Sequence, residues 1–158
     1  MAPPPVEEVR AHLEIGNVFF FVNSYRGPST EPHNFVLLSP SPADETPLLF
    51  VSATSQVARK KHSRSDAKPG TLVEVAVGEF PTVPWITQAT IFDCNEIDEL
   101  YIVQLSGCLG RMQGEDAWRR AHVGNPLLCK LVDGVIGSPE VRRRIRRALE
   151  AWKRTVGI

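Results

Sequence analysis

The sequence predicts an α+β fold in which a small, strongly curved antiparallel sheet is followed by C-terminal helices. About five or six short runs of β-branched and aromatic residues precede residue 105. Polar segments containing Gly, Pro, Asn or Ser separate these runs, as expected of hairpins and meanders. Beyond Gly110 the apolar residues recur at helical spacing instead. Strands first and helices afterwards are typical of an α+β domain.

Length and composition indicate a single domain with a sizeable core. The chain has 158 residues, 42% of them hydrophobic, and its 18 basic and 18 acidic residues leave a formal net charge of zero. Attraction to nucleic acid must therefore come from a local patch. Without a leader sequence or the roughly 20 apolar residues of a membrane span, we expect a soluble, cytoplasmic protein with no membrane partner.

Cysteines and histidines give no sign of a metal or cofactor site. Three cysteines match neither a paired metal-binding motif nor a disulfide framework, so we expect reduced thiols. Four histidines lie too far apart in the sequence to suggest a pair of ligands: His12, His33, His62 and His122. We therefore predict no metal and no cofactor.

The first three strands are expected at residues 17–22, 35–39 and 48–53. The first is aromatic and β-branched and is bounded by Gly16 and by a polar loop over residues 23–34. A turn rich in Pro and Ser separates the other two, which predicts a hairpin or meander.

The middle of the chain is expected to alternate between loops and strands. Residues 54–70 are strongly polar and predict a mobile loop, residues 71–77 an edge strand, and residues 85–92 the last clear strand. Residues 95–100 are too acidic for a core strand. Residues 101–105 fit either a strand or part of a helix.

Three helices are predicted after Gly110. Residues 115–123 and 127–134 form two short candidates, and Ser138, followed by Pro139 and Glu140, predicts the start of the last one. In that helix the apolar side chains share one face, from Val141 to Trp152, while arginines project outward. We expect an N-terminal lead-in (1–14), an SH3-like barrel (15–105) and a helical C-terminal extension packed on the barrel (106–158).

Four segments resemble, in order, the strands of MazF/PemK/Kid-type toxins. Residues 16–22 (Gly-Asn-Val-Phe-Phe-Phe-Val) are similar to the family's Gly-Asp-hydrophobic strand, with Arg26 and Gly27 at its loop arginine and glycine. Residues 35–39 resemble the strand Pro-Val-Leu-Val-Ile-Ser, and residues 51–55 the segment Val-Ala-Pro-Leu-Thr-Ser. Residues 87–93 (Thr-Gln-Ala-Thr-Ile-Phe-Asp) resemble Asp-Gln-Ile-Arg-Thr-Val-Asp.

The resemblance implies a cytoplasmic, homodimeric type II toxin that cleaves single-stranded RNA without a metal and is neutralised by an acidic antitoxin. In this reaction the ribose 2′-hydroxyl attacks the adjacent phosphate, which requires proton transfer and stabilisation of negative charge. The implied catalytic residues are Arg26, His33, Thr54 and Thr87. The implied RNA-binding residues are Ser55, Gln88, Lys60, Lys61 and Arg64.

Two departures from the family pattern favour an alternative. Thr87 stands where an acid is common and Thr90 where an arginine is frequent, and a hydroxyl is a poor general base at neutral pH. The alternative is a catalytically silent SH3-like barrel that binds protein or nucleic acid. Each polar residue above also has a plain structural interpretation, as a solvated loop charge, a strand end or the polar face of a strand.

Overall fold

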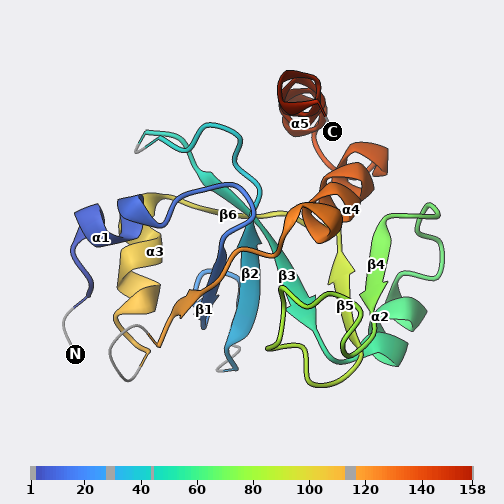
Figure 1. Ribbon diagram of the computed structural model, residues 1–158, viewed down its shortest axis with the longest axis horizontal. Helices are drawn as coiled ribbons and strands as arrows, with labels where there is room; N and C mark the ends of the chain where they lie inside the picture. Colours follow the sequence, from blue (N-terminus) through green and yellow to red (C-terminus); the bar gives the residue numbers. More distant parts are fainter. Residues whose placement is uncertain (1–2, 28–30, 44, 113–116, 158) are drawn as a thin grey trace.

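A computed structural model describes residues 3–27, 31–43, 45–112 and 117–157, which form an α+β fold around one antiparallel sheet (Figure 1). Within these residues the sheet has seven strands in the order β4-β5-β3-β2-β1-β7, and β6 pairs with β3 beside this path. The α+β class is confirmed. The sheet is open, because β4 and β7 lie at its two ends and pair with different neighbours.

Strand β3 is the centre of the sheet. It runs over Leu48–Thr54, pairs along β2 (His33–Leu37), and divides its other edge between β6 (Asp98–Leu100) and β5 (Thr90–Asp93). The remaining strands are β1 (Val18–Phe21), β4 (Leu72–Val75) and β7 (Arg119–Arg120).

Five helices surround the sheet in the described part of the chain. They are α1 (Val6–Ala11), α2 (Val57–Ser63), α3 (Ile102–Leu109), α4 (Asn125–Gly137) and α5 (Arg143–Val156). Helices α1 and α3 lie together beside β1, α2 lies near β5, and α5 packs on the outer side of α4 (Figure 1).

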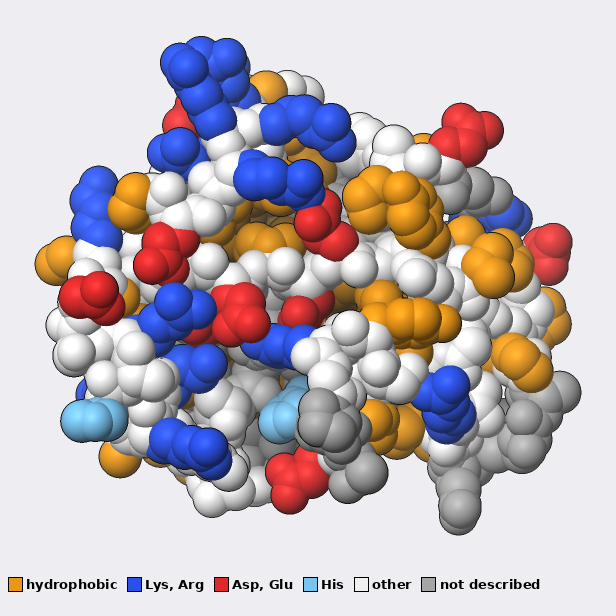
Figure 2. Space-filling model, turned by 180° about the vertical axis from the view of Figure 1, so that it is seen from behind, with side chains coloured by type: hydrophobic (Ala, Val, Ile, Leu, Met, Phe, Trp, Pro, Cys, Tyr) orange, Lys and Arg blue, Asp and Glu red, His pale blue; other side chains and the backbone are white. Residues whose placement is uncertain are grey.

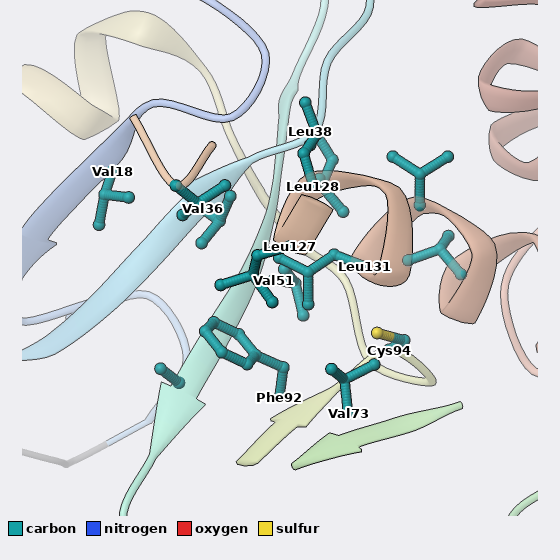
Figure 3. Close-up of a cluster of buried hydrophobic side chains, with 14 of the residues drawn as sticks. Val18, Val36, Leu38, Val51, Val73, Phe92, Cys94, Leu127, Leu128 and Leu131 are labelled. Atoms are coloured by element: carbon teal, nitrogen blue, oxygen red, sulfur yellow. The ribbon is translucent and has the colours of Figure 1, made fainter. Parts of the chain in front are cut away.

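The central strands are apolar because both faces of the sheet are covered. Val18 and Val36 belong to a core cluster under α4, together with Leu127 and Leu131 (Figure 3). Phe19, the residue after Val18 on β1, belongs instead to an aromatic cluster on the opposite face, packed against α1 and α3. Successive side chains of a strand point to opposite faces, so β1, β2 and β3 each contribute to both cores.

Several sequence predictions about elements are wrong. The expected loop at residues 54–70 contains α2, the acidic segment 95–100 contains β6, and the expected helix at 115–123 contains β7. Residues 115 and 116 of that expected helix lie outside the described part. Of the expected strand at 85–92 only residues 90–92 are in a strand, and the N–H of Ile86 instead closes a turn by donating to the Val83 carbonyl.

The last helix begins later than predicted. Its first residue is Arg143, whereas Ser138 follows the end of α4 and donates its hydroxyl proton to Asn95 Oδ1 at 2.6 Å. The same Ser138 Oγ accepts the N–H of Glu140 at 3.3 Å, within a turn. The local start signal is therefore used in a connection between helices. Residues 101–105, left open by the sequence, lie mainly in α3.

Candidate nucleic-acid interface

A cleft of about 490 Å³ lies where the β1–β2 loop, the ends of β2 and β3, and helix α2 meet. On the face seen in Figure 2, basic and acidic side chains form a band beside a hollow. The cleft is lined by Asn23, Arg26, Gly27, Glu31, His33, Phe35, Ser52, Thr54, Gln56, Arg59, Lys60, Ser63 and Asp93. Four of the nine predicted site residues are therefore brought together: Arg26, His33, Thr54 and Lys60.

Strand pairing explains why His33 and Thr54 are neighbours. Phe35 on β2 stands opposite Ser52 on β3, so residues further toward this end of the antiparallel pair also meet. The His33 ring confirms this, because its Nδ1 lies 3.3 Å from the Ala53 carbonyl oxygen. A carbonyl can only accept, so Nδ1 carries the proton and the lone pair of the neutral ring is on Nε2.

Thr54 has a hydroxyl that can still donate. Its Oγ1 accepts the backbone N–H of Gln56 at 3.2 Å, which leaves the hydroxyl proton for another acceptor. The neighbouring Ser55 is exposed but does not line the cleft.

Arg26 is held by two carboxylates and a hydroxyl. Its Nη1 donates to Ser52 Oγ and to Asp98 Oδ2, each at 3.1 Å, and its Nη2 lies 2.6 Å from Glu96 Oε1. About a third (34%) of the side chain is exposed. The guanidinium is therefore held in a fixed position at the cleft. A phosphate that bound it would have to compete with these two carboxylates for its N–H donors.

The buried carboxyl of Asp98 has an unusual affinity for protons. Burial raises its pKa to about 6, although the nearby Arg26 guanidinium acts in the opposite direction. The carboxyl is 8% exposed and does not line the cleft. Its role in the geometry is to position Arg26.

Helix α2 carries two cations that line the cleft and a third that does not. Arg59 and Lys60 line the cleft; within the described residues Arg59 makes no ion pair and donates only to the Gln56 amide oxygen at 3.2 Å. Lys60 Nζ is 3.6 Å from Asp93 Oδ2. Lys61 instead contacts Glu74 at 2.5 Å, outside the cleft lining.

Arg64, predicted to bind RNA, is engaged by carboxylates and is not among the residues that line the cleft. Its guanidinium contacts three carboxylates: Nε lies 2.8 Å from Asp93, Nη1 3.0 Å from Glu140 and Nη2 3.5 Å from Glu96. Burial lowers the pKa of Arg64, but the Asp93 hydrogen bond and surrounding carboxylates raise it overall.

Asp93 anchors a buried polar network at the edge of the cleft. Burial opposes its ionisation, but hydrogen bonds from Asn95 and Arg64 hold the pKa of Asp93 below its ordinary value. Asn95 Nδ2 also donates to Thr71 Oγ1 at 3.1 Å. The carboxylate therefore stays ionised at neutral pH and cannot donate a proton there.

Thr87 and Gln88 are not part of this cleft. Both are exposed in the turn segment before β5, and neither lines the cavity. Thr90 is buried at the start of β5 and donates to the Gln88 carbonyl at 2.9 Å. Of the segment 87–93, which resembles one strand of the toxin family, Asp93 lines the cleft and Thr87, the predicted catalytic residue, does not.

Sequence reasoning missed the carboxylates of the site. Glu96 and Asp98 belong to the acidic segment 95–100, and Asp93 is only the last residue of the segment 87–93 that resembles the family. Their approach to Arg26 and Arg64 depends on contacts between distant parts of the chain, which the sequence does not contain. Arg59 lies in the polar segment 54–70, which predicts a loop, so its position on a helix is not predicted.

Comparisons with models of protein families, with curated proteins and with solved structures find no match to this chain. Within the described residues, no cluster of three or more His, Cys, Asp or Glu is arranged to hold a metal ion. Likewise, none of the described helices has the length and apolar character needed to cross a membrane.

Proposed function

We propose that the chain is a MazF/PemK-like endoribonuclease that binds single-stranded RNA in the cleft beside α2 and cleaves it through the ribose 2′-hydroxyl. One observation carries the proposal: Arg26, His33, Thr54 and Lys60, from four different parts of the chain, line one cavity. Such a cavity combines proton transfer and phosphate binding, which the reaction needs.

His33 is the proposed general base. With Nδ1–H donating to the Ala53 carbonyl, the neutral ring presents Nε2 as its proton acceptor. This hydrogen bond also fixes the orientation of the ring, as is common for catalytic histidines. His33 would thus remove the proton of the 2′-hydroxyl.

The cationic side of the cleft is proposed to bind phosphate. Arg59 is free of ion pairs with described residues, and Lys60 Nζ lies 3.6 Å from the Asp93 carboxylate, a long ion pair, so both can contact phosphate oxygens. The Thr54 hydroxyl adds a neutral donor. Arg26 stabilises the charge of the phosphorane, and Lys60 supplies the proton to the departing 5′-oxygen.

End-group analysis with matched substrates tests the proposal. An end-labelled single-stranded RNA should be cut to fragments with a 2′,3′-cyclic phosphate and a 5′-hydroxyl, and its all-deoxy counterpart should stay intact. Cleavage of both substrates would exclude attack by the 2′-hydroxyl. If the folded protein cleaved neither substrate, the proposed ribonuclease activity would be excluded.

A silent binding module is the second candidate, and the environment of Arg26 favours it. Glu96 and Asp98 already neutralise this guanidinium, which weakens its attraction for phosphate. A silent module would retain labelled RNA on a filter without producing new ends. The two candidates are thus separated by the same RNA substrate.

The family resemblance also implies features beyond the cleft. It implies an SH3-like architecture for the curved sheet, a homodimer, a cytoplasmic location and an acidic antitoxin. These features stay predictions and are tested by oligomeric state in solution and by co-purification with the product of a neighbouring reading frame.

A further inference from the structure

A second concavity, a groove of about 570 Å³, runs along α5 on a different part of the molecule from the cleft. Its α5 wall includes Ile145, Ala148, Ala151 and Trp152. The opposite wall comes from Leu49, from Glu99, whose carboxylate is paired with Arg142, and from residues at the two ends of the β2–β3 loop: Ser39, Pro40, Ser41, Thr46 and Pro47. Much of the lining is thus apolar, and the small alanines leave room for another chain to approach closely.

A stripe of arginines borders this groove. At 100° per residue, Arg143, Arg147 and Arg154 lie together on the solvent side of α5, adjacent to the groove-lining residues. None of the three makes an ion pair with a residue that the structure describes, whereas Arg142 contacts Glu99 and Lys153 contacts Asp133. Basic side chains gather at the top of the molecule, where α5 lies (Figures 1 and 2).

We propose that the α5 groove binds an acidic amphipathic helix of another protein. The apolar side chains of that helix would contact Trp152, Ala148 and Leu49, and its carboxylates would pair with the arginine stripe. Helix-in-groove recognition uses this combination of an apolar stripe and charges at its border. Trp152, half-buried and amphipathic, is the type of residue that dominates binding energy in such contacts.

The chemistry of the groove favours a protein over a nucleic acid. Phosphate binding would use the arginines but would leave the apolar floor exposed to water, at a cost that rises with its area. Base stacking needs accessible aromatic faces, and Trp152 is the only aromatic side chain among the described lining residues. The occupant that fits both features carries apolar groups and negative charge on one helix.

The inference does not depend on the proposed ribonuclease activity. Among the described residues, the cleft and the α5 groove have no lining residue in common. A failed groove experiment therefore leaves the ribonuclease proposal intact, and the reverse also holds.

The test uses the full chain and a fluorescent, helix-stabilised synthetic peptide with a leucine stripe and glutamates elsewhere. The peptide should bind, and the double variant Arg143→Glu/Arg147→Glu should bind about tenfold more weakly, because two attractions become repulsions. Ala148→Gln should also weaken binding by filling the groove without changing charge. A matched double variant at exposed cations elsewhere, Lys68→Glu/Arg111→Glu, should bind as the unaltered protein does.

Two further probes decide the occupant. The same peptide with lysines in place of glutamates should not bind, and a single-stranded oligonucleotide should not compete for the groove. No binding of the acidic peptide, or equal binding of the lysine peptide, would overturn the proposal. Competition by the oligonucleotide that is lost with Arg143→Glu/Arg147→Glu would assign the stripe to nucleic acid instead. Circular dichroism confirms that each variant is folded.

Discussion

At the level of individual residues, carboxylates decide which cations at the cleft are free to meet a phosphate. Arg26 and Arg64 are each held by two or more carboxylates, whereas Arg59 makes no ion pair with a described residue. These carboxylates lower the positive electrostatic potential of the cleft, although the N–H donors of the arginines remain. Arg59 is therefore the residue on which phosphate binding should depend most.

Replacing Arg59 tests this dependence. Arg59→Ala should weaken RNA binding several-fold and reduce the slope of log affinity against log salt by about 0.7, the contribution of one contact to a single strand. Lys61→Ala is the matched control on the same helix, because Lys61 is engaged by Glu74 outside the cleft. Fluorescence anisotropy over a range of salt concentrations measures both, and equal slopes for the two variants would contradict the assignment.

Asp98 should make stability depend on pH. Its pKa is raised by burial from 3.8 to about 6, so the folded state binds this proton more tightly than the unfolded chain does. The carboxyl therefore contributes a fall in the free energy of unfolding as the pH rises from about 4 to about 6, on the order of 2–3 kcal/mol. Asp98→Asn should lack this fall.

Urea unfolding across that pH range measures the effect. Asp66→Asn, at an exposed aspartate, is the matched control and should follow the unaltered protein. If Asp98→Asn also followed it, the buried carboxyl would not have the proton affinity described.

At the level of elements, β2, β3 and α2 position the site, and α4 holds the sheet from behind. Gly134 of α4 lies so close to Cys94, the residue that follows β5, that a Cβ at this position would be 2.7 Å from Cys94 Sγ. The sulfur is buried, and burial raises the pKa of the Cys94 thiol, so it is a packing group and not a nucleophile.

Gly134→Ala should destabilise the fold by about 1–3 kcal/mol, because the clash outweighs the higher helix propensity of alanine. The double variant Gly134→Ala/Cys94→Ala should cost less than the sum of its two single changes, because removing the sulfur relieves the overlap. Thermal or urea unfolding of the unaltered protein, the two single variants and the double variant measures these costs. Strictly additive costs would contradict the close approach of α4 to β5.

Sequence patterns predicted the elements whose signals are local. Residues 17–22, 35–39 and 48–53 were recognised as strands because two covered faces make them continuously apolar. Helix α2 was missed because its seven residues bury no side chain completely and therefore show no apolar stripe. Ser138 was misassigned because its hydroxyl bonds Asn95, a partner 43 positions away that no local pattern contains.

The same distinction applies to the site. The resemblance of four ordered segments implies Arg26, His33 and Thr54, and antiparallel pairing brings two of them together. The same resemblance implies Thr87, but β5 begins only at Thr90, and Thr87 lies before the strand and outside the cleft lining. The carboxylates around Arg26 depend on tertiary contacts and could not be predicted.

For the molecule as a whole, the two concave surfaces proposed to bind ligands lie at different ends of β3. The cleft lies beside α2 and includes Ser52 and Thr54, and the groove lies along α5 and includes Leu49. With zero formal net charge, each surface must attract its ligand through its own arrangement of arginines and lysines.

Cleavage of single-stranded RNA by the His33→Ala variant, beside the unaltered protein and Lys61→Ala, tests the central claim most directly. The unaltered protein and Lys61→Ala should cut at equal rates, and His33→Ala should be slower by about two to four orders of magnitude, the usual contribution of a general base. Equal rates for all three proteins would contradict a catalytic cleft at His33.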